Sequence, residues 1–144
     1  MTIAKNAALV PTLKGWSAEK TKERVSELMN ITGLDPETYL HRFPLELSGG
    51  QQQRVGVVRA LAGDPNIVLM DEPFSALDPI SREQLQDELR NLQQRIQKTI
   101  VFVTHDMDEA LKIADHIIVL RAGKVEQTGS AHDLIHEPAN DFVR

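Results

Sequence analysis

The stretch Leu47-Ser48-Gly49-Gly50-Gln51-Gln52-Gln53-Arg54 is the most informative part of this chain. Two adjacent glycines stand between a serine and a glutamine, and glycine lets a backbone approach a ligand closely because it has no Cβ. Ser48 and Gln51 have the spacing of a capping box, and a helix pattern follows to about Ala62 with Arg54 on its surface. Such a helix start suits a phosphate, because its first amides and the positive end of the helix dipole are exposed. An ordinary turn that opens a helix gives the same pattern, so other residues must decide between the two.

The composition narrows the class of protein. The 144 residues suffice for one domain with a core, and 41% hydrophobic with 26% charged residues is typical of a globular chain. A net charge of −5 without a basic cluster argues against a nucleic-acid surface. The lack of cysteine excludes disulfides and thiolate metal sites, and no apolar run approaches the roughly 20 residues of a membrane span. We therefore expect a soluble protein that contacts a membrane only through a partner.

The first 45 residues predict a small helical unit. A helix over 2–10 is expected to begin at its cap Thr2 and to end before Pro11. Two further cap residues, Ser17 and Asp35, are expected to begin the next two helices.

Three short apolar runs after the glycine pair predict strands: Ile67–Met70, Ile100–Val103 and Ile117–Leu120. Unbroken runs rich in β-branched residues are typical of strands buried on both faces, as in a parallel sheet. Helix patterns capped by Asp78 and Asp106 separate these runs. The sequence therefore predicts an α/β fold with parallel buried strands and flanking helices.

Polar residues follow two of the predicted strands. Asp71-Glu72 ends the first strand and Thr104-His105 ends the second, so both pairs are expected at the same sheet edge, where α/β proteins bind ligands. An apolar strand that ends in aspartate is typical of a Mg²⁺ site in nucleotide hydrolases, and an adjacent glutamate can orient a water. Each pair also has a plain structural explanation, as the start of a polar loop or of a helix, and Ser75–Asp78 reads first as a helix cap.

As a set, these residues resemble the motifs of the ATP-binding-cassette (ABC) ATPases. Leu47–Arg54 resembles the signature motif, Ile67–Glu72 the Walker B motif with its catalytic glutamate, Ser75–Asp78 the D-loop, and His105 the switch histidine. The order and spacing of the four motifs also match the family.

The resemblance extends to one branch of these ATPases. Met1–Trp16, Leu34–Glu37 and Phe74–Ile80 are similar to the ATPase subunits of quaternary-amine importers, which take up osmoprotectants such as glycine betaine, proline betaine, choline or carnitine. Polar amino-acid importers share much of this pattern and remain an alternative.

The resemblance implies a fold and a set of partners. The fold would be a partial P-loop NTPase fold, with residues 1–45 as part of a helical subdomain and residues 46–144 as the C-terminal part of the ATPase core. A second ABC ATPase subunit would pair head to tail with this one, and a membrane permease would dock on residues 1–45. A substrate-binding protein would act indirectly, nucleic acid would not be a partner, and the location would be peripheral, at the cytoplasmic face of the cell membrane.

The resemblance also implies a site for ATP and Mg²⁺ that two subunits share. The residues that would bind the nucleotide held by the second subunit are Ser48, Gly49, Gly50 and Gln51. Asp71 would bind Mg²⁺ through water, Glu72 would polarise the attacking water and His105 would sense the γ-phosphate. Ser75 and Asp78 would connect the two sites across the subunit interface.

One departure from the family concerns the phosphate-binding loop. Gly-x-x-x-x-Gly-Lys-Ser/Thr occurs nowhere in the 144 residues, so the family's Walker A motif and Q-loop would precede residue 1. We expect a fragment that neither binds ATP tightly nor turns it over alone. A non-catalytic fragment that pairs with an intact ABC subunit is an alternative, as is an ABC ATPase of DNA repair or chromosome maintenance.

Overall fold

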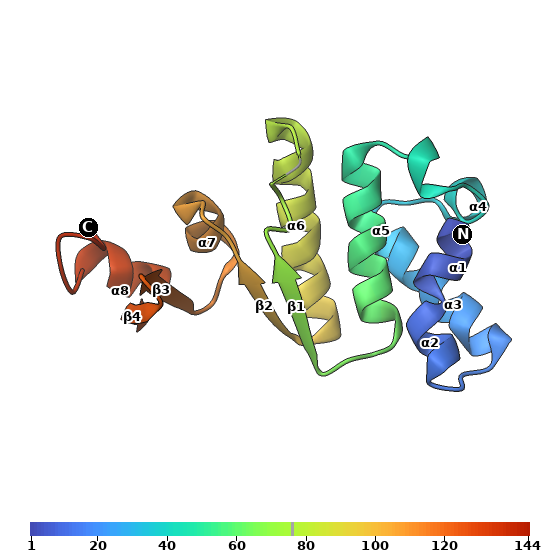
Figure 1. The fold of residues 1–144 in the computed structure, drawn as a ribbon, viewed down its shortest axis with the longest axis horizontal. Coiled ribbons are helices and arrows are strands. Elements are labelled where there is room, and N and C mark those ends of the chain that lie inside the picture. The colour runs from blue at the N-terminus through green and yellow to red at the C-terminus, as the bar shows by residue number, and fades with distance from the viewer. Residues whose placement is uncertain (76) are drawn as a thin grey trace. The chain divides into compact units, whose positions relative to one another are not determined.

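The computed structural model describes residues 1–75 and 77–144, which form two compact units, Met1–Val103 and Thr104–Arg144 (Figure 1). The elements of the first unit are α1 (Ile3–Ala7), α2 (Leu9–Leu13), α3 (Ala18–Ile31), α4 (Pro36–Tyr39), the 3-10 helix η1 (Pro44–Glu46), α5 (Gly49–Ala62), β1 (Ile67–Asp71), α6 (Pro79–Ile96) and β2 (Thr99–Val103). Those of the second are α7 (Met107–Ile113), β3 (Ile117–Arg121), β4 (Lys124–Gly129) and α8 (Ala131–His136). Among the described residues, none of the helices has the length and hydropathy that a membrane crossing requires.

The N-terminal region forms two short helices where the sequence predicted one. Thr2 accepts a hydrogen bond from the Lys5 amide (3.5 Å) and caps α1 as predicted. The prediction that Pro11 ends the helix is wrong, because α1 ends at Ala7 and Pro11 lies in the first turn of α2. Proline is tolerated there because amides of the first helical turn have no intrahelical acceptor.

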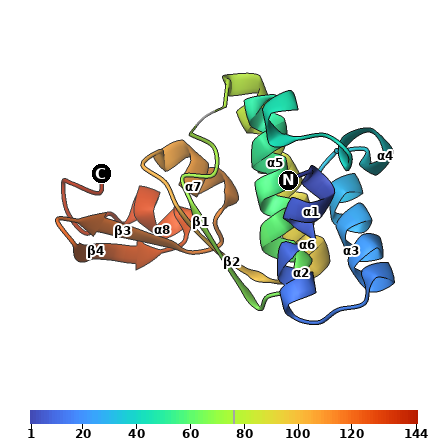
Figure 2. The same cartoon turned by 45° about the vertical axis from the view of Figure 1, so that its right-hand side comes forward.

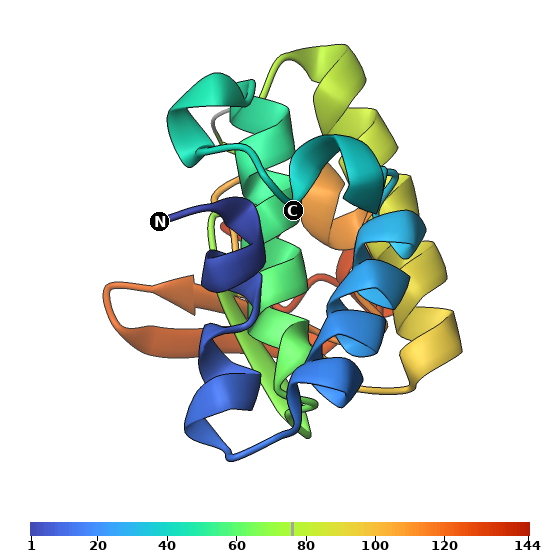
Figure 3. The ribbon, with the colours of Figure 1, turned by 90° about the vertical axis from the view of Figure 1, so that its right-hand side faces the viewer.

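Helices α1, α2 and α3 lie beside α5, as the views in Figures 2 and 3 show. The predicted cap Ser17 is confirmed, since its hydroxyl accepts from the Lys20 amide at 3.2 Å. Behind this cap, α3 buries Val25, Leu28 and Met29. Burial of these side chains fixes α3 against α5, whose own start is the predicted phosphate site.

Strands β1 and β2 pair in parallel, which confirms the predicted arrangement of the first two runs. The prediction that both faces are buried is wrong. On one face Val68 is 3% exposed, whereas Ile67, Leu69 and Val101 on the other face are 59%, 77% and 48% exposed. The reason is that α6 is the helix of this unit that covers the sheet, and it covers a single face (Figure 1).

The third apolar run forms β3, which pairs antiparallel with β4 in a sheet of its own. The expectation of a parallel third strand is therefore wrong. Ala122 (φ 48°) and Gly123 (φ 76°) form a tight left-handed turn, so the chain returns directly as the partner strand. Ile117, Val119 and Leu134 form the buried core of this unit.

Phe74 fixes the loop after β1 to the core. Its side chain is fully buried, and its ring packs edge-on against the Phe102 ring with 6.2 Å between the ring centroids. We expect Phe74→Ala to lower the free energy of unfolding by about 3–5 kcal/mol, since it removes a large buried ring and leaves a cavity. Chemical denaturation followed by circular dichroism measures this change. Phe43→Ala is the matched control, because Phe43 is 51% exposed and its loss should change stability by no more than about 0.5 kcal/mol. Equal effects of the two substitutions would contradict the assigned packing.

Asp64, in the loop between α5 and β1, pairs with Lys98 at 3.0 Å and with Arg24 at 3.8 Å. The hydrogen bond from Lys98, together with the charges of Lys98, Arg24 and Lys14, lowers the pKa of Asp64 below its ordinary value of 3.8. A depressed pKa in the folded state means that this carboxylate stabilises the fold above about pH 4 and loses that effect as the pH falls through the folded-state pKa.

We therefore expect Asp64→Asn to be less stable than the native chain at pH 7, with a difference that shrinks as the pH is lowered below about 4. Asparagine, like aspartate, readily adopts the positive φ of 50° found at this position, so the comparison isolates the effect of the charge. Denaturation curves of both chains from pH 7 to pH 3 make the test, and a difference that stays constant over this range would contradict it.

Candidate functional site

Helix α5 begins with the capping box that the sequence predicted. The Ser48 hydroxyl accepts from the Gln51 amide (3.3 Å), and the Gln51 side-chain oxygen accepts from the Ser48 amide (3.0 Å). Ser48 and Gly49 are exposed, and Gly50 is half-buried. Because Gly49 and Gly50 are the first two helical residues, their amides have no intrahelical acceptor and remain available to an anion.

Tyr39 is part of this site and was missed by the sequence analysis. Its phenol oxygen accepts a hydrogen bond from the Gln51 side-chain nitrogen at 3.0 Å. The two residues lie in different elements, α4 and α5, so no local spacing rule connects them. A second glutamine, Gln52, donates to the Leu47 carbonyl (3.1 Å) and fixes the loop before the helix.

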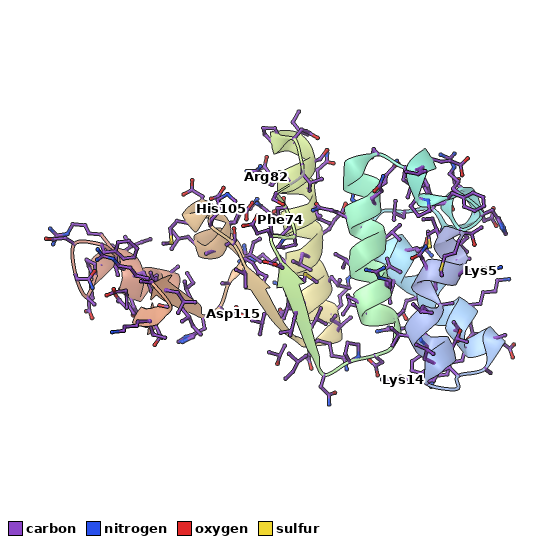
Figure 4. The ribbon with its side chains drawn as sticks, viewed as in Figure 1. Lys5, Lys14, Phe74, Arg82, His105 and Asp115 are labelled. Carbon is purple, nitrogen blue, oxygen red and sulfur yellow. The ribbon has the colours of Figure 1, made fainter. Side chains whose placement is uncertain are left out.

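The start of α5 also contacts the predicted D-loop. A Cβ on Gly50 would lie 3.4 Å from Leu77 Cδ2 and 3.8 Å from Ser81 Cβ, so the glycine allows this close approach. Leu77 is buried, and its carbonyl accepts from Arg82 at 3.3 Å (Figure 4). The structure therefore brings the signature residues and the D-loop together.

Asp78 caps α6, which confirms the helix cap that the sequence predicted at this position. Its carboxylate accepts from the amides of Ile80 (3.2 Å) and Ser81 (3.1 Å). Hydrogen bonds from the Ser81 side chain and amide hold the pKa of Asp78 below its usual range. Ala76, in the middle of the predicted D-loop, lies outside the described residues.

The predicted Walker B pair lies at the carboxyl end of β1, and both side chains are exposed. Asp71 is opposite Val103 in the strand pairing. Glu72 has a positive φ of 44°, donates its amide to the Val103 carbonyl (2.8 Å) and accepts at its own carbonyl from the Ser75 hydroxyl (3.0 Å). The turn thus fixes the backbone of Glu72 directly after the strand, and two residues later follows the buried Phe74, which Figure 4 labels.

His105 belongs to the second unit, where it lies two residues after β2 and is exposed. Its neighbours form a hydrogen-bonded helix start. Thr104 donates to Glu109 (2.6 Å), and Asp106 caps α7 by accepting from the amides of Asp108 and Glu109. This confirms the predicted cap and leaves the role of His105 as a prediction.

Asp71 is the residue at the end of β1 that would hold a Mg²⁺ ion. The ion is held in proteins by one or two carboxylates together with waters and phosphate oxygens, and the exposed carboxylate of Asp71 fits one such position. Within residues 1–75 and 77–144, no three His, Asp or Glu side chains gather into a metal site. These residues therefore suit an ion whose remaining ligands come from a nucleotide and water.

Arg54 was expected on the helix surface, and this expectation is wrong. Its side chain is 18% exposed and pairs with Glu88 of α6 at 3.1 Å. A Cβ on Gly33, which has a φ of +69°, would lie 3.2 Å from Glu88 Oε1 and 3.6 Å from Arg54 Nη1. Burial raises the pKa of Glu88, and the charge of Arg54 opposes this rise. This ion pair connects α5 to α6.

An apolar cleft of about 300 Å³ lies in the N-terminal helices. Its lining consists of Ala4, Ala8, Thr12, Trp16, Ala18, Thr21, Lys22, Val25 and Leu40. The Thr21 hydroxyl in this lining is buried and has no hydrogen-bond partner within the described residues. The cleft therefore offers small apolar side chains and one unsatisfied polar atom.

A family model and several known proteins match this chain. A family model described as ABC transporter matches residues 1–75. The chain is 57% identical, over 99% of its length, to the glycine betaine/carnitine/choline transport ATP-binding protein of Bacillus subtilis. It is 50% identical over 99% of its length to the osmoprotectant import ATP-binding protein of Salmonella typhimurium, and 49% identical over 100% to the glycine betaine/proline betaine transport system ATP-binding protein of Escherichia coli.

The chain spans about a third of each relative, namely 37%, 37% and 36% of their lengths. These similarities confirm the family that the sequence motifs indicated. The chain belongs to the ABC transporter family, and its α/β structure with a parallel strand pair is part of the P-loop NTPase fold of that family's ATP-binding subunits.

Proposed function

We propose that this chain is the signature-bearing segment of the ATP-hydrolysing subunit of an importer for quaternary-amine osmoprotectants. The observation that carries the proposal is the start of α5, where a capping box leaves Ser48 and Gly49 exposed. The solute class is supported by the names of the relatives, two of which are transport proteins for glycine betaine.

In this proposal the start of α5 completes a nucleotide site on a second, head-to-tail subunit. The Ser48 hydroxyl accepts from the Gln51 amide and keeps its own proton to donate to a γ-phosphate oxygen. The amides of Gly49 and Gly50 add two further donors at the positive end of the helix dipole. Gln51 belongs to the same set as the second half of the capping box.

The residues after β1 and β2 serve this subunit's own nucleotide. When bound, Mg²⁺ would neutralise charge that develops on the phosphates. Asp71 would hold that ion through a water, Glu72 would orient the attacking water and His105 would contact the terminal phosphate. Ser75 and Asp78 face the second subunit.

A membrane permease is the proposed partner of the N-terminal helices, and a substrate-binding protein acts through that permease. The cleft lined by Ala4, Ala8, Val25 and their neighbours has the size and apolar lining that accept side chains of a docking helix. The buried Thr21 hydroxyl is a place for a polar group of that helix. Such contacts would hold the subunit peripherally at the cytoplasmic face of the membrane.

The contact in trans predicts that association depends on nucleotide. This chain, mixed with the intact Bacillus subtilis relative, should associate in the presence of Mg·ATP and separate without it. Ser48→Ala should weaken this association about 10- to 150-fold, because it removes a hydrogen bond to a charged group, worth about 1.5–3 kcal/mol. Analytical ultracentrifugation with and without Mg·ATP measures both effects.

Ser17→Ala is the matched control for this experiment. It removes the N-cap serine of α3, at a cost of about 1 kcal/mol, but lies outside the proposed site. Nucleotide-independent association would favour a non-catalytic interaction fragment instead. Equal losses from Ser17→Ala and Ser48→Ala would reject the phosphate contact.

A separate prediction concerns hydrolysis by this chain alone. No Gly-x-x-x-x-Gly-Lys-Ser/Thr loop lies within the 144 residues, and loss of even one preorganised phosphate donor costs about 10²–10³ in rate. We expect no phosphate release above the background when the purified chain is supplied with millimolar Mg·ATP. Steady phosphate release that Glu72→Gln abolishes would contradict this expectation.

A further inference from the structure

We propose that Tyr39 is a positioning residue for the signature motif: its phenol holds Gln51, and Gln51 in turn fixes the Ser48 hydroxyl and the glycine amides that contact phosphate. This inference rests on the proposed function, because it assigns a role in the same phosphate site. Its basis is the hydrogen-bond geometry at the start of α5, in which Gln51 is shared between two elements.

Both ends of the Gln51 side chain are engaged within this chain. Its oxygen accepts from the Ser48 amide at 3.0 Å, and its nitrogen donates to the Tyr39 phenol at 3.0 Å. The Ser48 N–H determines which end of the amide group is the oxygen, because an exchanged nitrogen would meet it as a second donor, and the bond to Tyr39 holds the other end of the group in place. Tyr39 thereby keeps the capping box closed.

A closed capping box determines which groups are left for a phosphate. With Gln51 engaged at both ends, the donors at this helix start are the exposed Ser48 hydroxyl, the amides of Gly49 and Gly50, and the second N–H of the Gln51 side chain, which these two bonds do not use. In this conformation Gln51 acts chiefly by positioning the Ser48 hydroxyl and the glycine amides. The distinction separates Gln51 from the other three residues of the proposed nucleotide-binding set.

Tyr39 is itself held firmly enough to act as a support. It ends α4, which begins with Pro36 and is capped by Asp35 through the amides of Glu37 (3.3 Å) and Thr38 (3.1 Å). The Arg42 guanidinium lies over the Tyr39 ring at 5.0 Å. The phenol is therefore presented to Gln51 by an ordered element and not by a free loop.

The test uses Tyr39→Phe, which keeps the ring and its contact with Arg42 and removes only the hydroxyl. Nitrogen-15 NMR spectra of the native chain, titrated with the intact Bacillus subtilis relative in the presence of millimolar Mg·ATP, should show shifts of the Gly49 and Gly50 amides. In Tyr39→Phe the affinity obtained from these shifts should fall about 2- to 12-fold, the range that corresponds to the loss of one neutral hydrogen bond of about 0.5–1.5 kcal/mol. Hydrogen exchange of the Ser48 amide should also become faster.

Two further variants separate positioning from general stability. Thr38→Val removes another hydroxyl of α4, which bonds to Asp35 and not to Gln51, and should leave the affinity for the nucleotide-loaded relative unchanged. In a Gln51→Met background, Tyr39→Phe should have no additional effect on that affinity, because the bond is already absent. A purely structural role would change the unfolding free energy without changing the affinity of the folded protein.

The outcomes distinguish this inference from the function on which it rests. If the native chain shows no shift at Gly49 and Gly50 with the intact relative and Mg·ATP, the proposed phosphate site is rejected. If the native chain responds and Tyr39→Phe binds with equal affinity, the site stands and the role of Tyr39 is overturned. Should Tyr39→Phe not fold, Gln51→Met alone is expected to weaken binding about 5- to 150-fold, because it removes the bonds to both Ser48 and Tyr39, and unchanged affinity would overturn the inference.

Discussion

The paired hydrogen bonds between Ser48 and Gln51 determine where α5 begins, and the rest of the first unit depends on that helix. Helices α1, α2 and α3 pack on α5, and α6 lies along it. Had the helix begun one residue later, Ser48 would no longer accept from the third helical amide, and Gly49 would no longer be the first helical residue. The chemistry of the site and the packing of the unit therefore have a common origin.

Two of the contacts of α5 hold it against α6 and the loop that precedes α6. At the exposed end, Gly50 allows Leu77 and Ser81 to approach closely, and further along α5 the half-buried Arg54 pairs with Glu88. Either partner of a half-buried ion pair is costly to remove alone, because the other charge is left poorly solvated. These contacts hold the signature residues and the cap of α6 at Asp78 together, as the proposed site shared between two subunits would require.

The sequence predicted the features that local rules govern. Capping residues such as Ser17, Ser48 and Asp78 act on amides two or three residues away, so their patterns are visible in the chain itself. The features that were missed depend on distant residues. Tyr39 in α4 bonds to Gln51 in α5, Arg54 in α5 pairs with Glu88 in α6, and the exposure of Leu69 depends on which helices cover the sheet. An apolar run predicts a strand, but its partner and its coverage are set by tertiary structure.

The position of Tyr39 also bears on how a docking event can reach the nucleotide site. Leu40, the next residue, lines the apolar cleft proposed for the permease, and the Leu40 carbonyl accepts from the Ala4 amide at 2.9 Å. One short segment thus contacts the cleft through Leu40 and the signature glutamine through Tyr39. A displacement of this segment by an occupant of the cleft would lengthen the bond to Gln51 and loosen the capping box. By reciprocity, a phosphate that favours the closed capping box would favour the conformation of the cleft that goes with it.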